Sequence, residues 1–526
     1  MARVNKTSNK RSYGDQPSGY MKRNMFPAAK QFVATGQMGR LIPFYHAETL
    51  PGDIWNLRAE VMLRFLPMYF PIMHQIELSM HWFYVPRRIL NPTFEDFINP
   101  ATPDTEWAHC RLDQGGIYNG IATNTLETDS VFCYMGIPVS SGAVQDTISV
   151  DAHFVASYAK IYDDYYRFNP IQSELFQPLA EGANSWVNDI GFERPLFSAW
   201  NHDYFTSGLP EAQSGEDVLV PLFDSDQNVV QMRWGKESSG GVPDPGATAT
   251  TGRQLQDSNG DAIGLVPEDI NGEGASMQEF RLAARLLEFL EKSNRAGENY
   301  RDYIITTYGF DPMPGVVDEP QYIGGTRGQV MVSDVMSTSQ TLESDNSVSS
   351  VVGDYTGQAL ALQSSRSFKY YCKEWGDIVG IMRVRPRSSY YQGLHRKFTR
   401  STPLDYAQAE FAHLGDQPIL NQEIYLDYSG TNTNDEVFAY TPRYEEYRGD
   451  NDTVAGKMRD DFEAFHLARK FAATPSFNES FIQCQPDVAR VFNGVTESST
   501  EHEMFINVLN DNTVYRNLPR FGIPKL

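Results

Sequence analysis

The chain has 526 residues, of which 41% are hydrophobic and 13% aromatic, with 40 glycines and 30 prolines. This composition excludes an intrinsically disordered protein and favours a β-rich fold with many loops. The net charge of −23 is unevenly divided, because residues 1–40 hold eight Lys or Arg and one acidic residue, whereas the remainder holds 36 basic and 66 acidic residues.

The first 40 residues are interpreted as a basic N-terminal arm. Basic arms commonly bind nucleic acid through phosphate, and a solubilising tail is the alternative that charge alone leaves open. The start, MARVNKTSNKRSYGD, has no apolar core of a secretory signal, and residues 61–73 are too short and interrupted to span a bilayer, so we expect no membrane insertion. The candidate DNA contacts are Arg3, Lys6, Lys10, Arg11, Lys22 and Arg23, with Lys30 as a further candidate.

Two strands are predicted next in the chain. Residues 61–66 alternate between an apolar face with Val61, Leu63 and Phe65 and a second face. Residues 76–82 alternate Ile, Leu, Met and Trp with polar residues, and Pro86 is expected to end this strand. His74 and His81 would lie on opposite faces of such a strand, so a metal site formed with Glu77 is not expected.

A helix is predicted over residues 153–168, where Phe154, Tyr158, Ile161 and Tyr165 recur at helical spacing before Asn169-Pro170. Residues 203–275 follow as an acidic, glycine-rich surface insertion with 13 acidic and three basic residues. Within it, a calcium loop is a candidate metal site, although position 6 is Ala262 rather than Gly and a chance match is the alternative. The residues at positions 1, 3, 5 and 12 of that loop are Asp257, Asn259, Asp261 and Glu268.

Further helices are predicted from a capping box at Ser276 and Glu279 to Gly297, with an apolar stripe that includes Phe280 and Leu287, and then within NYRDYIITTYG. Strand signals return in SFKYYC, DIVGIMRVRP and EMFINVLN, and DDFEAFHLARKFA, residues 460–472, is a helix candidate. Strands at both ends of the chain favour one β domain over residues 41–526 with large insertions, and no βαβ rhythm is visible.

No local catalytic motif is present: phosphate-binding loops, a G-x-S-x-G elbow and H-E-x-x-H are all missing from the sequence. The segment SYYQGLHRKFTRSTPLDY, residues 389–406, interleaves aromatic and basic residues, as single-strand-binding segments do, while an ordinary loop with ion pairs is the alternative. Arg396, Lys397 and Arg400 are therefore a second set of candidate DNA contacts.

Several stretches in a fixed order resemble the major capsid proteins of the Microviridae, small single-stranded DNA phages, and most of all their gokushovirus-like branch. They cover most of the chain outside residues 100–275. Two parts depart from the family pattern: FGIPKL at the end lacks the second glycine, and the 203–275 insertion matches no family motif. The matching stretches are LPGDIWNL, FPIMHQIELSMHWFYVPRRI, RLAARLLEFLEKSNRAGENYRDYI, EPQYIGGTRG, SYYQGLHRKFTR, HLGDQPILNQEIY, YTPRYEEYRGDNDTVAGKMR and FHLARKFAATPSFNESFI.

The resemblance implies a mainly β fold, an eight-stranded antiparallel jelly roll with long inter-strand insertions and a few helices. It implies a structural protein without enzymatic activity or cofactor, whose copies form a T=1 icosahedral shell around circular single-stranded DNA. The arm would face the interior, and the 203–275 insertion would project at three-fold axes toward a host surface receptor.

The implied location is the virion, assembled in the cytoplasm of a bacterial host, with a small basic DNA-packaging protein and a pilot protein as further partners. The rival interpretation is a carbohydrate-active β-sandwich enzyme, which requires two carboxylates about 5–10 Å apart that a sequence cannot exclude.

Overall fold

The computed structural model describes residues 23–98, 110–112, 129–137, 151–180, 182–213, 233–236, 248–250, 254–256, 262–266, 277–297, 299–336, 341–342, 348–350, 355–429, 433–496 and 501–520. It separates into two compact units, Met1–Pro210 with Gly297–Leu526, and Glu211–Ala296. We call these the body and the insertion unit.

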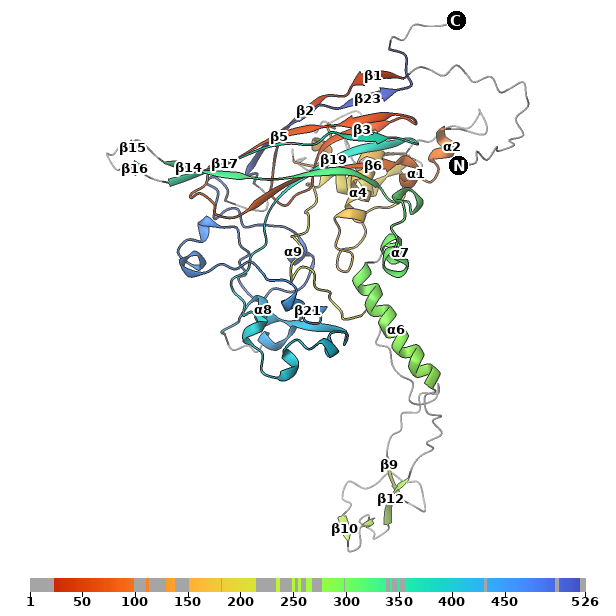
Figure 1. Cartoon of the computed structure of the whole chain (residues 1–526), viewed down its shortest axis with the longest axis vertical. Helices are drawn as coiled ribbons and strands as arrows, with labels where there is room; N and C mark the ends of the chain where they lie inside the picture. Colours follow the sequence, from red (N-terminus) through yellow and green to blue (C-terminus); the bar gives the residue numbers. More distant parts are fainter. Residues whose placement is uncertain are drawn as a thin grey trace, which may run out of the picture. The chain divides into compact units, whose positions relative to one another are not determined.

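The three largest sheets among the described residues of the body are antiparallel (Figure 1). The first has the order β13 (Gln321–Gln329), β6 (Ile76–Pro86), β19 (Gly376–Pro386), β3 (Ile42–Thr49). The second has the order β14 (Met331–Met336), β17 (Tyr355–Ser364), β5 (Ala59–Phe65), β22 (Met504–Asn510), β2 (Lys30–Gly36). The third has the order β1 (Asn24–Pro27), β23 (Thr513–Arg516), β4 (Ile54–Leu57), β18 (Phe368–Tyr371).

One hydrophobic core joins these sheets. Leu63 of β5 and Ile506 of β22 belong to the same buried cluster as Trp82 of β6, Met382 of β19 and Trp55 of β4. Sheets that share one core in this way pack face to face. The expectation of a mainly antiparallel β fold is confirmed, and the packing is consistent with a jelly roll, while the count of eight strands stays a prediction.

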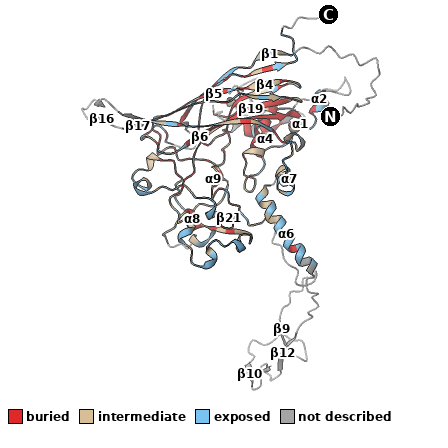
Figure 2. Ribbon diagram, viewed as in Figure 1, coloured by how far each residue is buried: buried red, intermediate tan, exposed pale blue. Residues whose placement is uncertain are grey.

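The strand predicted after residue 75 is confirmed as the long strand β6. Its apolar row of Ile76, Leu78, Met80 and Trp82 is buried in the core, and the strand ends at Pro86 as expected. The opposite face is also covered, because Phe83 and Val85 pack in a second cluster with helix α4 (His153–Tyr165). Figure 2 shows this buried region around β19 and α4 in red.

The remaining elements of the body are short. Strand pairs β20 (Asp416–Leu420) with β21 (Val437–Pro442) and β15 (Thr341–Leu342) with β16 (Val348–Ser350) are antiparallel, whereas β7 (Cys110–Leu112) and β8 (Gly182–Asn184) are parallel. The other helices of the body are α1 (Arg87–Leu90), α2 (Phe94–Ile98), α3 (Val131–Tyr134), α5 (Ser185–Phe192), α7 (Tyr300–Tyr308), α8 (Asn421–Ile424) and α9 (Glu479–Ile482).

The insertion unit contains helix α6 (Met277–Ala296) and a four-stranded antiparallel sheet. The predicted end of the helix is confirmed, because Gly297 adopts φ of 101°, a left-handed conformation that glycine tolerates. Ser276 of the predicted capping box lies outside the described residues. The strands of the sheet are β10 (Thr248–Thr250), β11 (Gln254–Gln256), β12 (Ala262–Val266) and β9 (Arg233–Lys236), in that order across it.

The helix predicted over residues 460–472 is wrong. Only a single 3-10 turn forms, Glu463–Phe465, and His466 after it is extended. The Arg469 guanidinium lies over the rings of Trp200 and Phe481, 5.0 and 4.0 Å from their centroids, and donates to the Phe481 carbonyl oxygen at 2.7 Å. Long-range packing of this arginine therefore overrides a local helical pattern.

Candidate nucleic-acid interface

The outward side of the β1–β23–β4–β18 sheet carries aromatic side chains in one row. Strand pairing places Met25 opposite Tyr515, Tyr515 opposite Ile54, and Ile54 opposite Tyr371. Tyr371 is 49% exposed and Tyr515 is 36% exposed. The alternate residues of the same strands, such as Trp55 and Val514, are buried in the core. Two tyrosine rings are thus available to solvent on one flat surface.

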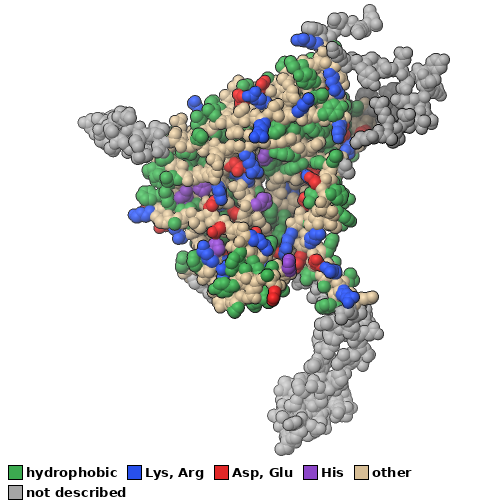
Figure 3. Space-filling view, viewed as in Figure 1, with side chains coloured by type: hydrophobic (Ala, Val, Ile, Leu, Met, Phe, Trp, Pro, Cys, Tyr) green, Lys and Arg blue, Asp and Glu red, His purple; other side chains and the backbone are tan. Residues whose placement is uncertain are grey.

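Basic side chains accompany this row. Lys369 lies two residues before Tyr371 on β18 and is exposed on the same face, and the Arg23 guanidinium lies 5.7 Å from the centre of the Tyr371 ring. The described part of the chain gives neither cation a carboxylate partner. Figure 3 shows further Lys and Arg side chains in blue over the part of the body that carries β1 and β23. We call Arg23, Lys369, Tyr371 and Tyr515 the aromatic–basic surface.

The sequence reasoning singled out Arg23 but missed the other three members of this surface. The signal for two of them was present in FKYY, where Lys369 and Tyr371 alternate with Phe368 and Tyr370 at the period of a strand. The sequence did not show which strands lie beside β18, because its partner β4 is far away along the chain: Tyr370 pairs with Trp55, 315 residues earlier. Strand β23 joins the same sheet on the other side of β4, where Tyr515 pairs with Ile54.

The second candidate segment, residues 389–406, is differently placed. Arg396 Nη1 lies 3.4 Å from Glu423, and Arg400 Nη2 lies 3.7 Å from Glu446, whose carboxylate is also 4.0 Å from Arg396. Burial raises the pKa of Glu423, and the neighbouring arginine opposes that shift. Two arginines therefore face two buried carboxylates, an arrangement that neutralises their charge inside the body.

Lys397 differs from its neighbours in this segment. It is exposed, and its ammonium lies 5.3 Å from the centre of the Phe398 ring, which is also exposed. The structure therefore brings Arg396 and Arg400 together around the buried acids and leaves Lys397 on the surface. DNA binding by this segment stays a prediction.

The other predicted site residues lie outside the described residues. They are Arg3, Lys6, Lys10, Arg11 and Lys22 of the arm and the candidate calcium ligands Asp257, Asn259, Asp261 and Glu268. Lys30 is described and exposed at the start of β2, and partial burial lowers its pKa. Residues 24–36 of the predicted arm contain the whole of β1 and β2, so this part of the arm is built into two sheets.

The two histidines of the segment 74–81 make hydrogen bonds within the chain. His74 Nε2 is 2.5 Å from the Arg387 carbonyl oxygen, and His81 Nδ1 is 2.7 Å from the Tyr166 hydroxyl at the end of α4. Burial, together with the charges of three nearby arginines, lowers the pKa of His81 to about 3, so the ring is neutral. Both histidines therefore contact other elements of the body.

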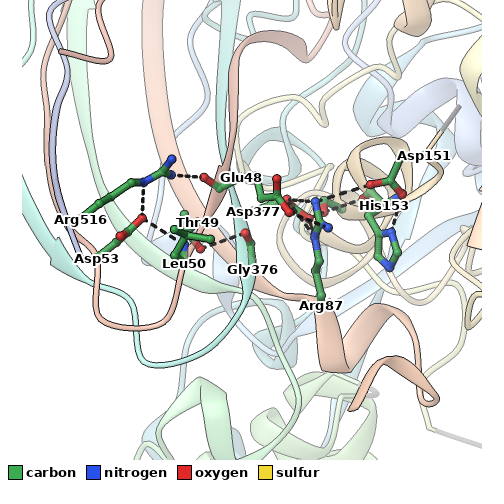
Figure 4. Close-up of polar contacts among 11 residues, drawn as sticks. Glu48, Thr49, Leu50, Asp53, Arg87, Asp151, His153, Gly376, Asp377 and Arg516 are labelled. Carbon is green, nitrogen blue, oxygen red and sulfur yellow. Dashed lines mark hydrogen bonds and ion pairs between the residues drawn. The ribbon is translucent and has the colours of Figure 1, made fainter. Parts of the chain in front are cut away.

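A buried ionic network lies where β6 ends (Figure 4). Arg87 makes a bidentate contact with Asp377 of β19, with its Nη2 at 2.9 Å, and its Nη1 lies 3.0 Å from Glu48 of β3. Asp151, just before α4, lies 3.6 Å from Arg87 and 2.5 Å from His153 Nδ1. Because Asp377 is fully buried, desolvation raises its pKa, and Arg87 opposes the shift. The network ties strands β3 and β19 to helix α1, which follows β6, and to helix α4.

This network contains a serine, a histidine and carboxylates, the residue types of a catalytic site with a serine nucleophile. The Ser157 hydroxyl donates to the His153 carbonyl oxygen at 2.8 Å, which is the preceding turn of the same helix. A nucleophile would instead donate its proton to the ring of the base. The geometry fits a structural role, in which the network holds neighbouring elements of the fold together.

Two further features of the described residues concern metal binding and membrane insertion. They contain no group of three or more His, Cys, Asp and Glu side chains positioned to hold a metal ion. Among the helices formed by the described residues, none has the length and apolar character needed to cross a bilayer.

Comparison with known proteins identifies the class. Residues 15–526 match the sequence profile of the capsid protein (F protein) family. The chain is 24% identical to capsid protein VP1 of Chlamydia phage 1 and 26% identical to capsid protein VP1 of Bdellovibrio phage phiMH2K, each over 98% of both chains. It is 23% identical to capsid protein VP1 of Spiroplasma virus 4 over 88% of both chains.

These relatives are named as capsid proteins, which is a structural role in the virion and not an enzymatic one. The carbohydrate-active enzyme alternative finds no support in them, and the expected likeness to gokushovirus-like Microviridae is confirmed. On its match over nearly the full length and its antiparallel β architecture, the chain belongs to the capsid protein (F protein) family.

Proposed function

We propose that copies of this capsid protein form a T=1 icosahedral shell around circular single-stranded DNA, and that the aromatic–basic surface binds this DNA. The observation that carries the proposal is the row of two exposed tyrosine rings with Arg23 and Lys369 beside them. Single strands are held without sequence preference by bases that stack on aromatic rings and phosphates that pair with cations.

The position of this surface in the chain supports the proposal. Arg23 belongs to the basic arm and directly precedes β1, the edge strand of the sheet. An arm that binds phosphate would therefore continue into a surface that stacks bases. Repetition of a few cations over every subunit of a shell adds many phosphate contacts.

The test is the double variant Arg23→Gln/Lys369→Gln in assembled particles. We expect shells to form and to release DNA at lower salt than the wild type. With a labelled oligonucleotide and dissociated subunits, the slope of log affinity against log salt should fall by roughly 1.4, because each lost phosphate contact contributes about 0.7.

The matched control is Lys457→Gln/Lys470→Gln. It removes the same two charges, but from lysines paired with Asp461 and Glu463 at 3.0 and 2.7 Å. DNA retention that is unchanged in the first variant, or reduced equally in both, would contradict DNA binding at the aromatic–basic surface. A control that releases DNA as readily as the first variant would show only a general effect of net charge.

We also propose that the insertion unit serves host attachment. It is compact by itself over Glu211–Ala296, which contains most of the predicted 203–275 insertion, so its removal should spare the body. Replacement of residues 210–272 by a short Gly/Ser linker should leave shells intact and reduce adsorption to host cells. Loss of soluble subunit would show instead that the body depends on this segment.

The remaining expectations stay part of the proposal. They are assembly in the cytoplasm of the bacterial host, projection of the insertion unit at three-fold axes, and association with a small basic DNA-packaging protein and a pilot protein in the particle. Purified particles resolved by gel electrophoresis and mass spectrometry would show which proteins accompany this chain.

A further inference from the structure

The outward face of the five-stranded sheet is unusually apolar. Along one row, strand pairing places Met331 opposite Leu360, and Arg64 between Leu360 and Phe505. In the next row, Leu362 lies opposite Met62, and Asn507 lies between Met62 and Val33. We call this surface the apolar face; its exposed apolar members are Val33, Met331, Leu360, Leu362, Phe505 and Leu509.

These side chains are exposed although they are in regular, well-paired strands. Val33 is 72%, Leu362 70% and Met331 79% exposed, while the residues next to them in the chain, Phe32, Ala361 and Val330, are buried in the core. The sheet is therefore apolar on both sides. Single exposed hydrophobic residues are ordinary, but a contiguous apolar surface on a folded protein marks a place where another surface binds.

The charges on the apolar face point to the kind of partner. Glu60 is paired with Arg58 at 2.7 Å, so that pair adds no net charge. Arg64 is exposed between two apolar neighbours, and the described residues give it no carboxylate. A partner that covers this face must bring apolar surface and an acidic group for one arginine. A nucleic acid offers phosphates but little aliphatic surface, whereas a copy of this chain, with its net charge of −23, offers both.

We infer that the apolar face is a contact between copies of this chain in the assembled shell. The inference rests on the family membership, which establishes self-assembly as the role of the protein, and it is independent of the DNA-binding proposal. Fully buried aliphatic residues with a charged pair at the margin are typical of stable subunit contacts.

The first experiment uses the double variant Val33→Lys/Leu362→Lys. Both side chains are solvent-exposed in the subunit, so the subunit should fold with a melting temperature close to the wild-type value. We expect shells, counted by negative-stain microscopy and sedimentation, to fall at least tenfold. The control is Ala472→Lys/Ala473→Lys, which adds the same two charges at exposed positions outside this sheet and should leave shell yield unchanged.

The second experiment needs no disruptive substitution. Leu362→Cys introduces a thiol that a maleimide should modify in dissociated subunits and not in shells, with the unsubstituted protein as the background. Because Leu362→Cys keeps a small apolar side chain, it also answers the question if the lysine variant does not fold.

The outcomes separate the possible occupants of the face. Equal thiol modification in shells and subunits, or wild-type shell yield from the folded lysine variant, would overturn the inference. Normal shells that lack DNA would also overturn it, and would assign the face to nucleic acid. Folded subunits that do not assemble, with a thiol protected in wild-type-like shells, are the expected result.

Discussion

Two regions of this protein carry aromatic and basic residues side by side in the sequence, and the structure places them in opposite environments. Around residues 389–406, Arg396 and Arg400 face the buried acids Glu423 and Glu446. On the aromatic–basic surface, Arg23 and Lys369 are exposed beside tyrosine rings, with no carboxylate partner among the described residues.

The difference between these two environments indicates that interleaved aromatic and basic residues predict a ligand only where the cations lack partners within the chain. An arginine that neutralises a buried acid contributes to stability through the charge it compensates, whereas an unpaired surface cation is available to phosphate. Substitutions in the two regions should therefore have separable effects, on folding in one and on DNA in the other.

The largest effect is expected for Arg396→Gln. It leaves Glu423 and Glu446 buried without a full charge partner, and breaking a buried pair costs about 3–5 kcal/mol. The free energy of unfolding, from denaturant titration of the subunit, should fall by that order. A variant that keeps its stability and loses affinity for single-stranded DNA would instead make Arg396 a DNA contact.

Glu503 sharpens the comparison because it is a buried acid without a close cation. Burial raises its pKa to about 7 from an ordinary value of 4.5, Met38 N–H donates to Oε1, and Oε2 has no hydrogen-bond partner among the described residues. Below pH 4.5 the carboxyl is protonated in both folded and unfolded states. As pH rises from 4.5 to 7 the unfolded chain releases the proton first, so stability falls, by up to about 3 kcal/mol.

The measurement is the difference in unfolding free energy between the wild type and Glu503→Gln at pH 5 and at pH 8. Glutamine can accept the Met38 N–H without a charge, so the variant should gain relative stability at pH 8. A wild-type minus variant difference that does not change with pH would show that Glu503 does not titrate in this range.

A smaller effect, confined to DNA, is expected for Tyr371→Ala and Tyr515→Ala. Stacking of one base on an aromatic ring contributes about 1–3 kcal/mol, so each variant should weaken binding of a labelled oligonucleotide by roughly 5- to 150-fold. Tyr371→Phe and Tyr515→Phe keep the rings and should bind as the wild type does. Equal losses for Phe and Ala would implicate the hydroxyl groups and not stacking.

The smallest effect is expected for Lys397→Gln. Its exposed ammonium can contact at most one phosphate, which lowers the salt slope of oligonucleotide binding by about 0.7, and stability should stay within about 0.5 kcal/mol of the wild type. A stability loss as large as that of Arg396→Gln would erase the distinction between the two neighbours.

Much of the fold was predictable because its signals are local. The alternation in β6 and the spacing of apolar residues in α4 each lie within about a dozen residues. Family membership was predictable because many such stretches occur in a fixed order. The failed helix at residues 460–472 shows the limit, since Arg469 takes its partners from Trp200 and Phe481.

The candidate surfaces depended on contacts that no local pattern contains. Arg87 meets Asp377 across 290 residues, and Arg396 meets Glu423 across 27. The apolar face was partly predictable from the sequence, because Met62 and Leu362 each alternate with buried neighbours. Which strand lies beside which, and hence whether exposed apolar residues form one surface, is decided by sheet order.

The order of the strands also controls when the protein is able to assemble. Strand β22 lies between β5 and β2, and β23 lies between β1 and β4, so the last strands of the chain complete sheets begun by the first. During synthesis, β1 and β2 lack their neighbouring strands β23 and β22 until the end of translation. A chain that ends before β22 and β23 therefore lacks Phe505 and Leu509 of the apolar face and Tyr515 of the aromatic–basic surface.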